Sequence, residues 1–269
     1  MKRSFAFSRL CTVIASAVAA LHVVAGLANA GEPEGCGTFE MSPAVITLDQ
    51  LPQAYAISAT DQGDRFLKSG NYVRAIACYT DAIDTNPKYV RAFSHRGLAY
   101  KSLEDFPRAI ADQTSAISLE PNVANHYVNR GNAYRENLQL DLSIGDHSKA
   151  LSIEPNNVGA LNGRCYARAQ SGSGATAIPD CDRAIQILPV GAIFDTRGYA
   201  HLRMGNAAKA IMDYNEALRL DPSIAESWFG RGVAKGKTGD KPGSSADISK
   251  ARSLDNRIDA KMARIGIVP

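Results

Sequence analysis

Cys165 and Cys181 are the two residues whose spacing could support a covalent bond. If a turn lies midway between them, two antiparallel helices would place the thiols opposite each other, and a disulfide is geometrically possible. Two small buried thiols that only fill a core are the alternative. After residue 30 the chain has two further cysteines, Cys36 and Cys78, which such a disulfide would leave as a second pair.

The other residues that could do chemistry form no recognisable catalytic or metal site. The histidines after residue 30 are scattered and lack His-Glu-x-x-His spacing, and no paired Cys-x-x-Cys is present. These histidines are His95, His126, His147 and His201. The glycine-rich run 171–174 has no following lysine, so it indicates a turn rather than a phosphate site. No Gly-x-Ser-x-Gly elbow occurs. The sequence therefore predicts no enzymatic activity, no metal and no cofactor.

A repeated unit must position these side chains. The dipeptide Arg-Gly recurs at residues 96–97, 130–131, 197–198 and 231–232, and Arg164-Cys165 fills the gap in the series. In the first five repeats a proline follows 24 residues after the glycine position. These prolines are Pro87, Pro121, Pro155, Pro189 and Pro222. The chain is therefore an array of repeats of about 34 residues.

Each repeat reads as two helices joined by a turn. Apolar and small residues follow helical spacing in both halves of a repeat, as in Phe93, Gly97 and Tyr100 and then Ala109 and Ala116. Glycines mark the turn between the halves in four of the repeats, and they are Gly70, Gly172, Gly205 and Gly239. The proline ends the second helix because it lacks a backbone donor. We therefore expect an all-α chain of stacked helical hairpins.

The repeat resembles the tetratricopeptide repeat family, whose pattern has aromatics at positions 4, 11 and 24, small residues at 8, 20 and 27, and proline at 32. The second repeat matches it with Phe93, Gly97, Tyr100, Ala109, Ala116 and Pro121. The resemblance implies a right-handed α-α superhelix, or solenoid, of about six hairpins over residues 56–258. The expected repeats are 56–89, 90–123, 124–157, 158–190, 191–224 and 225–258. The sixth departs from the pattern at Ser244 and Asn256.

Two repeat positions change together. Position 7 is arginine and position 23 is aspartate in repeats two to six, whereas the first repeat has Gln62 and Cys78 there. We therefore expect an ion pair inside each of these five hairpins, since the guanidinium fork suits a carboxylate at a fixed distance. The pairs are Arg96 with Asp112, Arg130 with Asp146, Arg164 with Asp180, Arg197 with Asp213 and Arg231 with Asp247. A ladder of arginines for an acidic ligand is the alternative.

The two ends of the chain differ from the repeats. Residues 1–30 have the layout of a signal peptide, with basic residues before an apolar run and Ala28-Asn29-Ala30 at its end. We expect cleavage after Ala30 and a periplasmic or secreted protein with no membrane span after cleavage; an uncleaved anchor is the alternative. Residues 31–55 are expected to be an extended lead-in, and residues 259–269 a capping helix and tail.

Charge argues against two classes of partner. Three of the 30 basic residues and none of the 27 acidic residues lie in the first thirty, so 27 of each remain after cleavage. A formally neutral chain without a run of Lys or Arg does not favour nucleic acid or an anionic membrane surface.

The resemblance also implies which residues line a concave groove and bind a partner. In this sequence they are Arg91, His95, Asn125, Asn129, Asn132, Arg135, Asn162, Tyr166, Tyr199 and Arg203. The asparagines could hydrogen-bond an extended peptide, with Tyr166 and Tyr199 as apolar anchors. We therefore expect a scaffold or adaptor in the cell envelope that binds another protein or a peptide segment. An ordinary solvated surface is the alternative for any one of these residues.

Two other functions are open. A carrier of a small ligand or glycan could use Tyr166, Tyr199 and Trp228 as stacking platforms. A hydrolase or transferase with an unrecognised site would need a deep pocket with clustered acids or bases.

Overall fold

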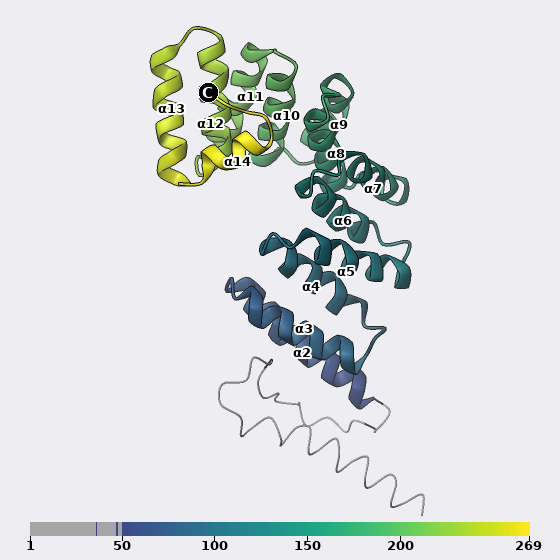
Figure 1. Cartoon of the computed structure of the whole chain (residues 1–269). Helices are drawn as coiled ribbons and strands as arrows, with labels where there is room; N and C mark the ends of the chain where they lie inside the picture. The colour runs from purple at the N-terminus through teal and green to yellow at the C-terminus, as the bar shows by residue number, and fades with distance from the viewer. Residues whose placement is uncertain (1–35, 37–46, 48–49) are drawn as a thin grey trace, which may run out of the picture. The chain divides into compact units, whose positions relative to one another are not determined.

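The computed structural model describes Cys36, Thr47 and residues 50–269, and the regular structure within these residues consists of helices α2 to α14 without a strand. The predicted signal peptide and most of the predicted lead-in lie outside these residues. The chain divides into two compact units, of which the first ends at Asp105 and the second begins at Phe106. Figure 1 labels the helices of both units. This helix content confirms the predicted all-α class with about six hairpins.

The first unit contains α2 (Leu51–Lys68), α3 (Tyr72–Thr85) and α4 (Val90–Ser102). Helix α2 begins inside the segment that the sequence predicts to be extended up to residue 55, so that prediction is wrong at its C-terminal end. The physical reason is that Pro52 lies in the first turn of α2, where a missing backbone N–H breaks no helical hydrogen bond.

The second unit is a continuous stack of helices, each packed on its neighbours. Its helices are α5 (Phe106–Leu119), α6 (Ala124–Glu136), α7 (Leu140–Ile153), α8 (Val158–Gln170), α9 (Gly174–Ile187), α10 (Gly191–Arg203), α11 (Ala207–Leu220), α12 (Ala225–Lys237), α13 (Lys241–Leu254) and α14 (Ile258–Arg264). The sixth hairpin, α12–α13, is regular despite its departures from the repeat pattern. Helix α14 packs on both of its helices.

Small side chains and left-handed turns shape the hairpins. Ala75, Ala177 and Ala210, at repeat position 20, are buried and let paired helices approach closely. The turn between the helices needs a positive φ, which glycine supplies in four repeats. In the second and third repeats Glu104 and Leu138 adopt this conformation, with φ of 60° and 59°. The turn geometry is therefore kept even where the sequence has no glycine to mark it.

His147 is a buried polar residue in the core of the third hairpin. It occupies position 24, where the family pattern has an aromatic side chain, and it is fully buried. Neither ring nitrogen has a hydrogen-bond partner within the described part of the chain. Burial, together with the positive charges of Arg135 and Arg164, lowers the pKa of His147 to about 3. The ring is therefore neutral in the folded protein.

This shift predicts a loss of stability in acid. Because the folded pKa of His147 lies below the ordinary value of 6.5, the unfolded chain binds more protons between the two values. The contribution of neutral His147 is fully present above the unfolded pKa and is lost as the pH falls. From about pH 7 to about pH 5 it should remove about 2 kcal/mol from the free energy of unfolding.

Urea unfolding of the wild type and of His147→Gln at both pH values measures this loss. Gln113 is buried at the same position of the preceding repeat, so the fold already accepts glutamine there. We expect acidification to cost the variant about 2 kcal/mol less than the wild type. Equal losses in the two proteins would contradict the assignment to His147.

Candidate protein-binding surface

The arginines at repeat position 7 pair with aspartate inside their own hairpins. In the second unit the shortest nitrogen–oxygen distances are 2.6 or 2.7 Å, and Nε and Nη2 both reach the carboxylate. These pairs are Arg130–Asp146, Arg164–Asp180, Arg197–Asp213 and Arg231–Asp247. The prediction is confirmed for these four hairpins. The fifth pair, Arg96 with Asp112, would join the two units and stays a prediction.

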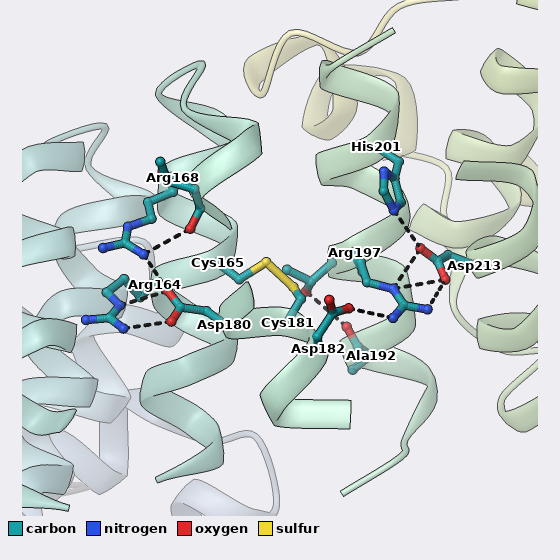
Figure 2. Close-up of a disulfide and its surroundings, with 12 residues drawn as sticks. Arg164, Cys165, Arg168, Asp180, Cys181, Asp182, Ala192, Arg197, His201 and Asp213 are labelled. Carbon is teal, nitrogen blue, oxygen red and sulfur yellow. Dashed lines mark hydrogen bonds and ion pairs between the residues drawn. A yellow bond between two sulfur atoms is a disulfide. The ribbon is translucent and has the colours of Figure 1, made fainter. Parts of the chain in front are cut away.

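Each of these arginines also donates from Nη1 to the preceding repeat. The acceptor is always the polar residue at repeat position 25, as in Arg197 to Asp182 at 2.7 Å (Figure 2). Arg231 donates in the same way to Asn215 at 2.8 Å. Arg130 and Arg164 reach a threonine and a serine at the same position, and so does Arg96 in the first unit. The guanidinium groups are thus engaged within the fold, which argues against a ladder for an acidic ligand.

The structure contains a disulfide between Cys165 and Cys181, with 2.02 Å between the sulfurs and 5.6 Å between the Cα atoms. Figure 2 shows it joining α8 and α9 between two of the arginine–aspartate pairs. The two cysteines occupy repeat positions 8 and 24. The bond therefore crosses the fourth hairpin and locks its two helices together.

The second disulfide explains why the first repeat lacks an arginine–aspartate pair. Cys36, which precedes the array, bonds to Cys78 at position 23. Gln62, at position 7, donates its side-chain N–H to the backbone carbonyl of Cys36. Positions 7 and 23 of the first repeat therefore both bond to Cys36. This explains why neither holds the arginine or the aspartate of the other repeats.

In the first unit the predicted partner-binding residues of α4 contact α2, the first helix of the preceding repeat. Arg91 lies 2.9 Å from Asp61 and also donates to Asp64. His95 Nδ1 lies 2.6 Å from Asp64 Oδ1, which also accepts from the Tyr79 hydroxyl at 2.7 Å. Burial raises the pKa of Asp64, but the hydrogen bonds from Tyr79, His95 and Arg91 outweigh it and hold that pKa below its ordinary value. Arg91 and His95 are thus held by acidic residues of α2.

In the second unit four of the predicted residues lie together on α6, α8 and α10. We call these four residues, Arg135, Tyr166, Tyr199 and Arg203, the aromatic row. The rings of Tyr166 and Tyr199 stack with centroids 4.9 Å apart. The guanidinium of Arg135 lies 4.3 Å from the Tyr166 centroid. Burial raises the pKa of Tyr199 to about 12. The row is thus a stacked pair of largely buried tyrosine rings with an arginine at each end.

The predicted asparagines lie on α6 and α8. Asn125 accepts a hydrogen bond from Asn157 at 3.4 Å, while Asn129 and Asn132 are half-buried. The side-chain carbonyl oxygen of Asn162 is buried and has no hydrogen-bond partner among the described residues. Such an oxygen is an acceptor that a bound N–H group could satisfy.

A segment that sequence reasoning did not place contacts the aromatic row. The hydroxyl of Tyr199 donates to the backbone carbonyl of Ile265 at 3.1 Å, and Arg203 Nη1 donates to the same oxygen at 3.4 Å. Ile267, two residues later, is buried. The helical pattern predicts a capping helix at this end of the chain, but nothing in that pattern indicates which earlier residues it would touch.

Asp195 of α10 is a second residue whose environment the sequence does not reveal. Its carboxylate accepts a hydrogen bond from the Ser227 hydroxyl at 2.6 Å. Burial raises the pKa of Asp195 to about 7, although the hydrogen bond from Ser227 opposes this shift.

The described residues contain no group of His, Cys, Asp and Glu side chains that could hold a metal ion. Nor does any described helix have the length and apolar character to cross a membrane.

The repeat geometry agrees with three family models. A model described as TPR repeat matches residues 63–104, and two described as tetratricopeptide repeat match residues 90–123 and 196–241. The chain belongs to the tetratricopeptide repeat family. No curated protein matches this tetratricopeptide repeat chain.

Several solved structures share the fold of the chain at low sequence identity. A tetratricopeptide repeat protein from Parabacteroides merdae is 19% identical, with a TM-score of 0.67 over 78% of this chain and 83% of the other. PilW, a type IV pilus biogenesis factor, is 17% identical, with a TM-score of 0.67 over 77% and 98% of the two chains. The match to the Cut9–Hcn1 structure has 14% identity and a TM-score of 0.70, and covers 82% of this chain but 44% of the other.

Proposed function

We propose that this chain is a protein–protein interaction scaffold of the cell envelope that binds a partner segment in the concave groove of its first helices. One observation carries the proposal: the aromatic row already binds a backbone carbonyl of the chain itself, through Tyr199 and Arg203. Tetratricopeptide repeat proteins are in general non-enzymatic scaffolds, which agrees with this role. The envelope location rests on the signal-like residues 1–30.

Side-chain contacts favour a protein partner over a small ligand or glycan. Stacking on a sugar needs a free aromatic face, but the ring of Tyr166 faces both Tyr199 and Arg135. The guanidinium of Arg231 lies 4.6 Å from the Trp228 ring centroid, and the Trp228 indole N–H donates to the Pro222 carbonyl. The aromatic platforms of a glycan carrier are therefore already in use.

Photo-crosslinking in cells tests the proposal. A photoreactive residue replaces Asn132 of α6 or, as a control, Met212 of α11, whose side chain is 70% exposed. We expect a discrete protein adduct from position 132 alone, outside the cytoplasm, and mass spectrometry of the adduct identifies the partner. Adducts from both positions would indicate non-specific contact, and adducts from neither would overturn the proposal.

A further inference from the structure

Helix α14 ends in a turn that leaves one carbonyl facing outward. The Ile267 N–H donates to the Met262 carbonyl at 2.9 Å, and the Gly266 N–H donates to the Ala263 carbonyl at 3.0 Å, with φ of 78° at Gly266. These two bonds are the Schellman arrangement that closes a helix C-terminus. They do not use the carbonyl of Ile265, which instead meets the aromatic row.

The aromatic row complements this helix end in charge and shape. A helix C-terminus carries partial negative charge, and here the cation of Arg203 and the hydroxyl of Tyr199 both donate to the Ile265 carbonyl. A Cβ at Gly266 would lie 2.5 Å from Nη1 of Arg203 and would displace the guanidinium from its present position. The φ of 78° at Gly266 favours glycine as well.

The buried side of α14 continues the core of the second unit. Ile258, Met262 and Ile267 are buried in the cluster that contains Tyr199, and Ile265 packs against it. The spacing of residues 258, 262 and 265 follows one face of a helix. Val268, the next residue along the chain, is 62% exposed. Recognition therefore stops at Ile267.

The far side of α14 contacts helices from much earlier in the unit. Arg264 donates to the backbone carbonyl of Glu136, the last residue of α6. Its guanidinium also lies 5.4 Å from the ring centroid of Phe106, the first residue of α5. Helix α14, drawn in yellow beside α12 in Figure 1, thus packs on the last hairpin, while the side chain of its Arg264 reaches the helices that open the unit.

We propose that α14 with residues 265–267 is an intramolecular ligand of the aromatic row, and that the protein partner presents a short helix of the same kind. Such a helix has apolar residues at positions i, i+4 and i+7, a basic residue at its last turn and a glycine just after it. This inference rests on the proposed function, because the partner and α14 use the same row. The ligand is therefore a helix end and not an extended peptide.

The length of α14 makes its displacement feasible. A helix of seven residues is too short to be stable in water by itself, so α14 is helical because it is docked. Two hydrogen bonds to one carbonyl and a small set of buried aliphatic side chains hold its end on the row. A partner helix that makes the same contacts competes with α14 directly.

Binding of a labelled peptide with the sequence of residues 256–269 tests the proposal by fluorescence anisotropy. The peptide is titrated with the full chain as wild type, as Ile267→Asp and as the matched control Val268→Asp. The aspartate at position 267 removes the buried anchor of α14, whereas the same change at position 268 is exposed. We expect Ile267→Asp to bind the peptide at least about tenfold more tightly than the other two proteins, because the free row is more populated.

Circular dichroism and amide hydrogen exchange check that Ile267→Asp stays folded and loses protection only in α14. If it unfolds, Gly266→Ala replaces it, since its added Cβ meets Arg203. Peptide binding that is no tighter than in the wild type would overturn the inference. Such a failure, together with a crosslinked partner at position 132, would leave the proposed function standing. Peptide binding without any crosslink would leave α14 as a ligand of the row and overturn both the proposed function and the helical partner.

Discussion

Gly163→Ala is expected to lower the free energy of unfolding by about 3 kcal/mol. A Cβ at position 163 would lie 2.3 Å from Cε1 and 2.4 Å from Nε2 of His147. The imidazole ring has little room to retreat, because it is fully buried and also lies close to Gly131 of α6. The added methyl group must therefore separate α8 from α7.

Gly145→Ala is the matched control for this change. Gly145 lies within α7, and a Cβ built there meets no atom within 4 Å. Alanine should stabilise the helix by about 1 kcal/mol relative to glycine. Urea unfolding followed by circular dichroism measures both variants. Effects of the same sign would refute the close approach of α7 and α8.

The double variant Cys165→Ala, Cys181→Ala is expected to lose about 3 kcal/mol of stability. The bond closes a loop with a sequence separation of 16, so its loss enlarges the conformational entropy of the unfolded chain. Both side chains are fully buried, and alanine leaves little empty space behind them.

Guanidinium unfolding of the wild type and the double variant, each without reductant, measures this loss. The control is the variant Cys36→Ala, Cys78→Ala, which keeps the hairpin bond and removes the other disulfide. The two variants should then respond differently to added dithiothreitol, because only the control still has the hairpin bond to lose. A double variant as stable as the wild type would show that the bond contributes nothing.

The hairpins could be predicted because their determinants are local. An alanine at position 20, a turn glycine or both mark five of the six helix pairs through contacts between residues close in sequence. The third pair, with Ser143 and Leu138 at these positions, is indicated by the repeat spacing alone. The ion pairs could be predicted as well, because the six repeats of one chain can be aligned with each other. Gln62 and Cys78 of the first repeat replace both the arginine and the aspartate of the other five.

The remaining features depend on contacts that periodicity does not encode. Tyr199 and Ile265 are separated by 66 positions, and no repeat relates them. The hydrogen bond from each arginine to the preceding repeat does have a signal in the sequence. Position 25 is a hydroxyl, carboxylate or amide residue in each repeat that supplies an acceptor, as at Thr80, Asp182 and Asn215. This signal cannot be recognised within a single repeat, because the donor and the acceptor belong to different repeats.

The two-sided bonding of these arginines has an evolutionary consequence for repeats three to six. Each arginine requires only an aspartate in its own repeat and a polar residue at position 25 of the one before. A duplication or deletion of one whole repeat among these four therefore leaves every guanidinium with both kinds of partner, and the array can change length without passing through an unpaired intermediate. The first repeat lacks this freedom, because a copy placed further along would carry Cys78 without Cys36.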